Sequence, residues 1–341
     1  MSVKLLCLGD IMLGENLSHY KRGIRTQFQS DYSKLIPTVL SEHIRKDVDL
    51  IFYNLEYSLA APKDFFNKTI HENIYKGTSE SLSVFEGSPI VVSVANNHFG
   101  QHGVEGCKFT KQLLQQKGIY IVGETGHPVT ITLNNSKMLF WGVTLVGDKY
   151  GNGEYFKSTY NTIMNDLKFP AKKNDNENWL ISIHWGDEYL NTPSFEQREL
   201  AKKIIEKGFD VIIGHHAHTI NPIEFYKDKL IMYSLGNFLF DQDFSRRTTT
   251  GLAVSVLLND KPSIFKSFLT RQKEYKINKV TEVPAADIIW EPSFKFYKTK
   301  KKLLTYWYRM LMKVEEFVHF KELDKETIGY MKDKLKNKIR V

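Results

Sequence analysis

The chain has 341 residues, 42% hydrophobic and 25% charged, a composition typical of a globular protein with a full core rather than of a disordered or fibrous one. Its formal net charge is +8, but residues 295–341 hold 14 of the 47 basic and 6 of the 39 acidic residues, so the whole excess belongs to that tail. The body of the chain is electrically neutral, and we do not expect it to bind nucleic acid.

Two cysteines, Cys7 and Cys107, form no disulfide framework, which suits a reducing compartment. The first six residues lead directly into an apolar strand and lack the pattern of a signal peptide. No apolar run approaches the ~20 residues that a membrane-spanning helix needs. We therefore expect a cytoplasmic protein.

Short apolar runs alternate with amphipathic segments in the first part of the chain and pair with one another later. This order predicts an α/β fold with a central mixed sheet, or two packed sheets, flanked by helices. Ser194 and Gln197 predict a capping box at one helix start. The expected strands are 3–9, 49–53, 89–94, 119–122, 129–133, 138–145, 179–183, 209–213, 221–226, 230–234 and 252–258. The expected helices are 33–46, 103–117, 157–167, 194–207 and two beyond residue 300, with 60–80 irregular.

Side chains that can bind metal follow five of these strands directly. Because the carboxyl ends of strands in an α/β sheet meet at one edge, we expect these side chains to converge. Carboxylate, amide and imidazole ligands together suit one or two borderline divalent ions such as Mn, Fe or Zn. The candidate ligands are Asp10, Glu56, Asn97, His184, His216 and His218.

The strongest indication of a metal site is the segment 214–218, which holds three histidines directly after an expected buried strand. In an extended turn, His216 and His218 project to the same side, so both imidazoles can reach one ion. The alternative is a solvated loop that happens to be rich in histidine. His215 is interpreted as a packing or supporting residue.

A two-metal site needs one carboxylate that bridges the ions, and Glu56 is the candidate. Such a site would hold a phosphoryl group and ionise a water molecule for in-line attack. His98, beside the candidate ligand Asn97, is the candidate acid that protonates the leaving oxygen.

Six segments together resemble the CapA family, the poly-γ-glutamate capsule-synthesis proteins of the calcineurin-like metallophosphatase superfamily. The resemblance covers about residues 3–245 and implies a four-layer α/β/β/α sandwich with a dinuclear metal centre. Beyond the resemblance, the periodicity becomes helical from about residue 300, so we expect a domain at 1–290 followed by a basic helical tail at 291–341. The segments are Gly-Asp-Ile-Met-Leu-Gly (9–14), Asn-Leu-Glu (54–56), Ala-Asn-Asn-His (95–98), His-Trp-Gly-Asp-Glu-Tyr (184–189), Gly-His-His-Ala-His (214–218) and Tyr-Ser-Leu-Gly-Asn-Phe-Leu-Phe-Asp-Gln (233–242).

Carried over by position, the resemblance implies that Asp10 is the first-motif aspartate and Glu56 the bridging carboxylate. Asn97 and His98 resemble the pair of ligand and catalytic acid, and His184 resembles the lone histidine of the fourth motif. His216 and His218 resemble the closing His-x-His. Further candidates for substrate contact or for support of a ligand are Asn54, Asn96, Tyr150, Trp185, Glu188 and Asn237.

Three positions depart from the pattern. Phosphatases of the superfamily carry a histidine where this chain has Met12, and an acidic residue where it has Phe99. Within the CapA pattern an aspartate is common where Gln101 stands. One metal is therefore expected to lack a ligand.

These patterns favour a metal-dependent, phosphoesterase-like hydrolase that acts in capsule or cell-surface polymer synthesis on a phosphorylated or polymeric small molecule. The alternative is a non-catalytic metal-binding accessory protein of a capsule or polysaccharide assembly complex. In the tail, residues 298–314 mix basic and aromatic side chains. They predict either a helix packed on the body or peripheral contact with the inner face of the membrane.

Overall fold

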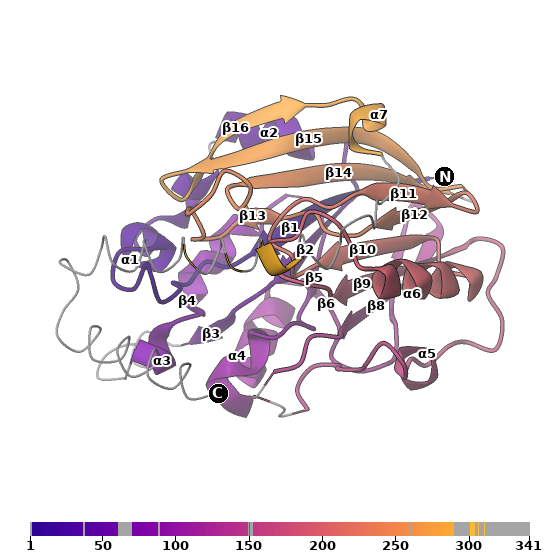
Figure 1. Ribbon diagram of the computed structural model, residues 1–341, viewed down its shortest axis with the longest axis horizontal. Helices are drawn as coiled ribbons and strands as arrows, with labels where there is room; N and C mark the ends of the chain where they lie inside the picture. The colour runs from indigo at the N-terminus through magenta and orange to yellow at the C-terminus, as the bar shows by residue number, and fades with distance from the viewer. Residues whose placement is uncertain are drawn as a thin grey trace.

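Two β-sheets with helices outside them make up the protein, as seen in a computed structural model (Figure 1). The structure describes residues 2–36, 38–60, 70–87, 89–148, 150, 153–259, 261–289, 301–303, 306 and 310. Within these ranges, no helix combines the length and the apolar character that crossing a bilayer requires.

The first sheet has the order β16-β15-β14-β1-β2-β5-β6, with β13 paired to the end of β1. Its strands β1, β2, β5 and β6 are mutually parallel, whereas β14, β15 and β16 form an antiparallel meander beside β1. The strands are β1 (Val3–Ile11), β2 (Leu50–Leu55), β5 (Ile90–Ser93), β6 (Tyr120–Val122), β13 (Asn237–Leu239), β14 (Thr250–Leu258), β15 (Ser263–Lys273) and β16 (Lys276–Glu282).

The second sheet has the order β11-β12-β10-β9-β8-β7. Its four inner strands are parallel, and the two edge strands are antiparallel to their neighbours. The strands are β7 (Val129–Leu133), β8 (Ser136–Thr144), β9 (Glu177–His184), β10 (Val211–His215), β11 (Ile223–Tyr226) and β12 (Lys229–Met232). A separate pair joins β3 (Ser58–Ala60) to β4 (Lys76–Thr78).

Three apolar layers hold the sheets and helices together. The middle layer lies between the sheets, where Phe52 of β2 stacks on Phe140 of β8 with ring centroids 5.3 Å apart. Each fully buried side chain of this size contributes about 1.5–3 kcal/mol. The outer layers pack helices on the free face of each sheet, which gives the predicted four-layer α/β/β/α arrangement. The helices are α1 (Ile24–Phe28), α2 (Thr38–Arg45), α3 (Ile70–Asn73), α4 (Gly103–Gln116), α5 (Ile163–Asp166), α6 (Phe195–Glu206) and α7 (Ala285–Ile288), with 3-10 turns at Tyr32–Leu35, Ser79–Val84 and Phe99–His102.

Local sequence predicted most elements, and the capping box at Ser194 and Gln197 is present. The helix expected at 33–46 is instead divided at Ile36, which is extended because the next residue in the sequence is proline. The helix expected at 157–167 is short, because Ser158 N–H donates to Thr144 O and keeps the segment beside β8.

The β15–β16 hairpin was not predicted. Its turn residues, Glu274 and Tyr275, both have left-handed φ values of 51° and 63° without the glycine or asparagine that usually marks such a turn. The tail helices and the boundary at residue 290 fall almost wholly on residues outside the described ranges.

Close strand approach positions the end of β1. A Cβ on Gly9 would lie 2.0 Å from the carbonyl oxygen of Gly236, so only glycine lets β13 lie against β1 here. Asp10 N–H donates to that same carbonyl at 2.9 Å. The β1–β2 register shifts between Cys7 and Asp10, and this irregularity directs the Asp10 side chain toward the second sheet.

Candidate metal centre

The carboxyl ends of strands from both sheets meet at one edge of the sandwich. Asp10 lies near the end of β1, Glu56 directly follows β2, and His184 ends β9. The loop after β5 carries Asn97, and the turn after β10 carries the histidines at 216 and 218. The structure therefore brings the six sequence-predicted ligands into one region.

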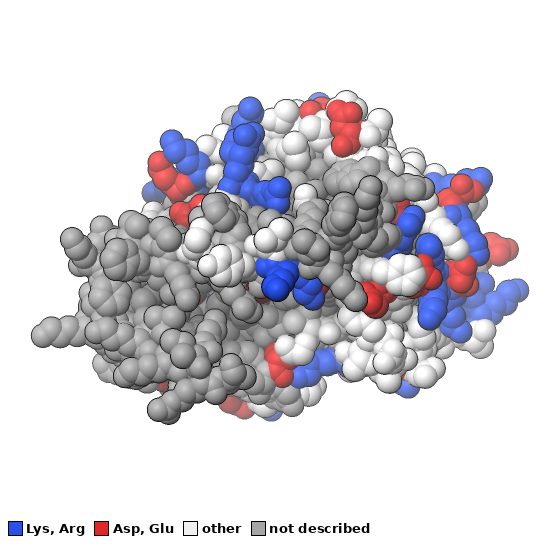
Figure 2. Space-filling view, viewed as in Figure 1, with Lys and Arg blue, Asp and Glu red and all other residues white. Residues whose placement is uncertain are grey.

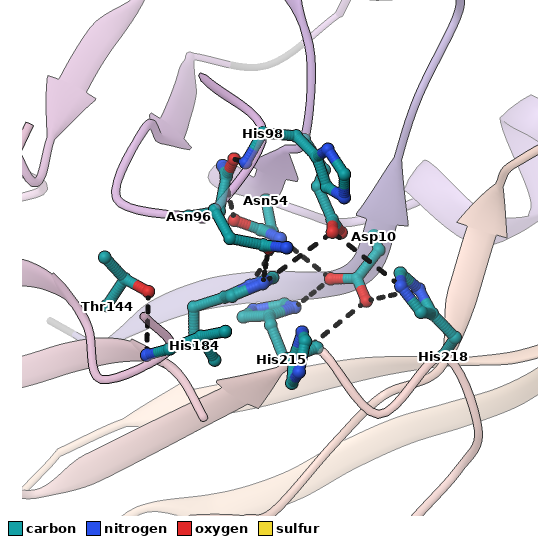
Figure 3. A network of polar contacts seen from close by, with 12 residues as sticks. Asp10, Asn54, Asn96, His98, Thr144, His184, His215 and His218 are labelled. Atoms are coloured by element: carbon teal, nitrogen blue, oxygen red, sulfur yellow. Dashed lines mark hydrogen bonds and ion pairs between the residues drawn. The ribbon is translucent and has the colours of Figure 1, made fainter. Parts of the chain in front are cut away.

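Asp10 is the buried centre of this region (Figure 3). Its Oδ1 accepts hydrogen bonds from Asn54 Nδ2 at 2.9 Å and lies 2.8 Å from His215 Nδ1. Its Oδ2 accepts from the backbone N–H of His216 at 3.3 Å and lies 3.4 Å from His218 Nδ1. Burial raises the pKa of Asp10, but the hydrogen bonds from His215 and His218 outweigh it and hold that pKa well below its usual range.

Glu56 is fully buried, and among the described residues neither carboxylate oxygen accepts a hydrogen bond. His184 Nε2 and His218 Nε2 each lie 3.7 Å from Oε1, too far for a hydrogen bond. Burial raises the pKa of Glu56 well above its ordinary value. A buried carboxylate without hydrogen-bond partners costs folding free energy unless a positive charge lies beside it.

Two groups of candidate ligands share Glu56. The first joins Glu56 to His184 and His216, and the second joins Glu56 to Asp10 and His218. Within each group the donor atoms lie within 4.8 Å of one another. One carboxylate common to two adjacent groups is the arrangement that a bridged pair of ions requires.

His216 and His218 reach these groups in a different way from the one predicted. Their backbones are left-handed, with φ of 90° and 53°, rather than extended. The two rings nevertheless lie 6.1 Å apart, so the turn still directs both imidazoles into one region. Non-glycine residues seldom adopt this conformation, and such strain is concentrated at functional sites.

The imidazoles differ in charge. Burial, together with the charge of His218, lowers the pKa of His216 to about 3, and burial lowers that of His184 well below its usual range. Burial also lowers the pKa of His218, but the charge of Glu56 and the hydrogen bond to Asp10 raise it to about 10. Neutral imidazole is the form that binds metal, so His184 and His216 are ready ligands, whereas a metal must displace a proton from His218.

Unpartnered polar atoms test whether these residues fit a metal. Among the described residues, His216 Nδ1, His215 Nε2 and both oxygens of Glu56 are buried without hydrogen-bond partners. Together with Asn97 Oδ1, which lies 2.8 Å from His184 Nε2, they present the oxygen and nitrogen mixture that borderline divalent ions prefer. The residues fit a divalent metal.

His98 stands beside the ligands and is held on two sides. The ring of Tyr75 stacks on it with centroids 3.7 Å apart and planes within 4°. His98 Nδ1 lies 3.1 Å from Gln101 Oε1, and Gln101 in turn donates to the Ile74 carbonyl at 3.3 Å. If Nδ1–H donates to Gln101, the other ring nitrogen, Nε2, is the atom that takes part in proton transfer.

Several candidates prove to support other residues. Asn54 links Asp10 to His184, whose Nδ1 lies 3.3 Å from Asn54 Nδ2. Asn237 Oδ1 lies 2.9 Å from His218 Nδ1 and so fixes that ring. Asn96 folds the loop before His98, because its Oδ1 accepts from two backbone N–H groups and its Nδ2 donates to the Leu55 carbonyl.

The remaining candidates lie farther from the ligands or at the surface. Trp185 is fully buried, and its Nε1 donates to the Tyr233 carbonyl at 3.0 Å. Glu188 is exposed and forms a third candidate group with His216 and His218. Tyr150 is half-buried, and its backbone N–H donates to Asp148 at 2.7 Å.

Both departures from the phosphatase pattern are core residues. Met12 is fully buried, and its sulfur accepts from the Gly14 N–H at 3.2 Å, so it turns away from metal binding. Phe99 is fully buried against Tyr155 with ring centroids 6.2 Å apart.

Sequence reasoning missed Tyr75 and left Asp241 out of the candidate site. Tyr75 lies in the stretch that was expected to be irregular, and no motif marks it. Asp241 is buried with Oδ1 unpartnered among the described residues, while Oδ2 accepts from Asn16 N–H at 2.7 Å. It lies in the segment 233–242 that the family resemblance identified, but its burial was not predictable from that pattern.

Comparison with known proteins adds family information to this geometry. The family model for the bacterial capsule synthesis protein PGA_cap matches residues 4–242. The chain is 31% identical to the PGA biosynthesis protein CapA of Bacillus subtilis and 27% identical to the capsule biosynthesis protein CapA of Bacillus anthracis, each over 72% of its length. These matches cover 65% and 61% of the two relatives. A probable polyglutamine synthesis accessory protein of Mycobacterium tuberculosis is 24% identical over 71% of this chain and 75% of its own length.

Proposed function

Because the chain belongs to the family of the bacterial capsule synthesis protein PGA_cap, we propose that it is a metal-dependent hydrolase of the phosphoesterase type. Its place is in the synthesis of a capsule or cell-surface polymer, either a glutamate polymer or a polysaccharide. The names of the Bacillus relatives support the glutamate polymer. The substrate is a phosphorylated or polymeric small molecule.

The observation that carries this proposal is the buried carboxylate of Glu56, shared by two groups of candidate ligands and without hydrogen-bond partners in the described chain. A structural glutamate would be paired with a cation or with N–H donors, as Glu177 is with Lys137 at 2.7 Å. Glu56 has no hydrogen bond of this kind, and only the imidazoles of His184 and His218, each at 3.7 Å, lie beside it, which favours a dinuclear Mn, Fe or Zn centre.

Bound ions of this kind act as Lewis acids and supply a hydroxide at neutral pH. The residues of the chain then perform the other tasks. The ions are held by the six candidate ligands, Asp10, Glu56, Asn97, His184, His216 and His218. Two asparagines, Asn54 and Asn237, fix the ligand side chains. His98, with its ring held by Tyr75 and Gln101, donates a proton from Nε2 to the leaving oxygen.

A second function has a specific observation in its favour. Met12 packs in the core where the phosphatases of the superfamily place a histidine, so one group of ligands is smaller than in those enzymes. An accessory protein that binds metal without catalysis would tolerate that loss. The name of the mycobacterial relative, an accessory protein, agrees with this alternative.

The basic tail is proposed to make peripheral contact with the inner face of the membrane. Its few described residues include Leu303 and Tyr306, which are 65% and 72% exposed. Lys301 Nζ lies 2.7 Å from Asp187 Oδ1, so this residue of the tail contacts the loop after β9. Binding of the full chain to vesicles with anionic and with neutral lipids tests this contact.

Metal analysis of protein purified without chelators tests the hydrolase proposal. About two equivalents of Mn, Fe or Zn in the native chain, lost in a His216→Ala, His218→Ala double variant, are expected. A screen with phosphomonoesters and phosphodiesters then follows. Metal without activity would favour the accessory protein, and absence of metal from the native chain would refute both functions.

A further inference from the structure

A cavity of about 950 Å³ opens between the segment 243–249 and the β15–β16 hairpin. In the view of Figure 2, lysine and arginine side chains gather at the upper left, over the end of that hairpin. The side chains that matter here are Phe244, Arg246, Arg271, Lys273, Tyr275 and Lys279, all of which line the cavity. We call it the basic cavity.

The positive charges of the basic cavity are poorly neutralised. In the part of the chain that the structure describes, the side chains of Arg246, Arg271 and Lys279 form no ion pair. The two acidic lining residues already pair with other side chains, since Asp243 lies 2.9 Å from His19 Nε2 and Glu274 lies 3.9 Å from Lys273. A concave surface with unneutralised cations concentrates anions.

The basic cavity adjoins the candidate metal centre. Phe244 at its wall packs edge-to-face on Tyr189, with ring centroids 5.4 Å apart. Tyr189 in turn lies 6.0 Å from the ring of His218. One aromatic side chain, that of Tyr189, therefore separates the cavity wall from a candidate ligand, so the basic cavity and the candidate metal centre are neighbours in the fold.

We infer that the basic cavity binds carboxylate groups along an anionic polymer whose reacting end lies at the metal centre. Arginine guanidinium groups match carboxylates in a bidentate fashion, and Phe244 and Tyr275 offer apolar surface to the methylene groups between them. The identity of the polymer, a chain of γ-linked glutamates, depends on the proposed function, whereas the anion site depends only on the cavity.

A binding measurement on the full chain tests this inference. A labelled γ-linked glutamate oligomer is titrated, in chelator, against the native chain and an Arg246→Gln, Arg271→Gln, Lys279→Gln variant. The control removes the same charge elsewhere, by Lys108→Gln, Lys117→Gln and Lys203→Gln at exposed positions on or next to α4 and α6. The cavity variant should bind the oligomer about tenfold more weakly, because it loses three partly exposed ion pairs with the oligomer's carboxylates. The control variant should bind as the native chain does. An uncharged glutamine oligomer should not bind.

Equal binding by the cavity and control variants, or no binding by the native chain, would overturn the inference. Competition by inorganic phosphate as effective as that by the oligomer would also overturn it, because it would assign the cavity to a single small anion. Since chelator is present, the result does not depend on the metal centre. Failure of the proposed hydrolase would show instead as absent metal or absent turnover with oligomer binding intact.

Discussion

Replacing Glu56 with glutamine should change the stability of the protein in opposite directions with and without metal. In the metal-free chain, ionised Glu56 has no hydrogen-bond partner among the described residues, and burial raises its pKa well above its usual range. The folded state thus holds this proton more tightly than the unfolded state, so stability falls as pH rises above the ordinary value for glutamate. At pH 8, Glu56→Gln should therefore raise the free energy of unfolding by about 1–3 kcal/mol.

With metal present, the native chain should be more stable than the Glu56→Gln variant. The native chain gains about 2.7 kcal/mol at a metal concentration of 100 times the dissociation constant. The variant lacks the carboxylate common to both ligand groups and should gain little. Urea denaturation at pH 8, once in chelator and once with Mn²⁺, measures both differences.

Glu177→Gln is the matched control for this experiment. Glu177 is also a buried glutamate, at the start of β9, but it accepts hydrogen bonds from Lys137 and Asn174, each at 2.7 Å. Its replacement should destabilise the protein equally in both conditions. If Glu56→Gln destabilises the metal-free chain as Glu177→Gln does, then Glu56 is a structural ion-pair partner of the histidines, and the bridging role is refuted.

Three further changes test the site. His98→Gln should lower turnover about 10²–10⁴-fold while metal content, measured by elemental analysis, stays at the native level, and loss of metal would make His98 a ligand instead. Asn237→Ala should weaken metal affinity about 10–100-fold, measured by competition with a chromogenic chelator, because His218 Nδ1 loses the nearer of its two partners; an unchanged affinity would argue against that support. Burial raises the pKa of Asp241 to about 7, so the folded state keeps a proton that the unfolded state releases near pH 4. The free energy of unfolding should therefore fall as the pH rises from about 4 to about 7. Asp241→Asn should remove this fall, raising stability at pH 8 by at most about 4 kcal/mol with no gain below pH 4, and a pH-independent difference would contradict the assignment.

The sequence by itself determined the strands that carry the candidate ligands, the helices α4 and α6, and the identity of the candidate ligands. Apolar runs closed by a polar residue are local signals, and they are enough to place Asp10, Glu56 and His184 at strand ends. The capping box at Ser194 is equally local, because its partners are three residues apart. Such features depend on neighbours in the chain, so the pattern alone predicts them.

Tertiary structure decided everything that depends on contacts between distant segments. The left-handed turn at His216 and His218 is stabilised across the two sheets by Asp10, which lies 206 positions from His216 in the chain, so no local rule could predict it. The lack of a hydrogen bond to Glu56 from any described residue and the stacking of Tyr75 on His98 also arise from packing between separate elements. The basic cavity formed with the β15–β16 hairpin could not be expected either, because its turn lacks the usual residues and its charges are scattered along the sequence.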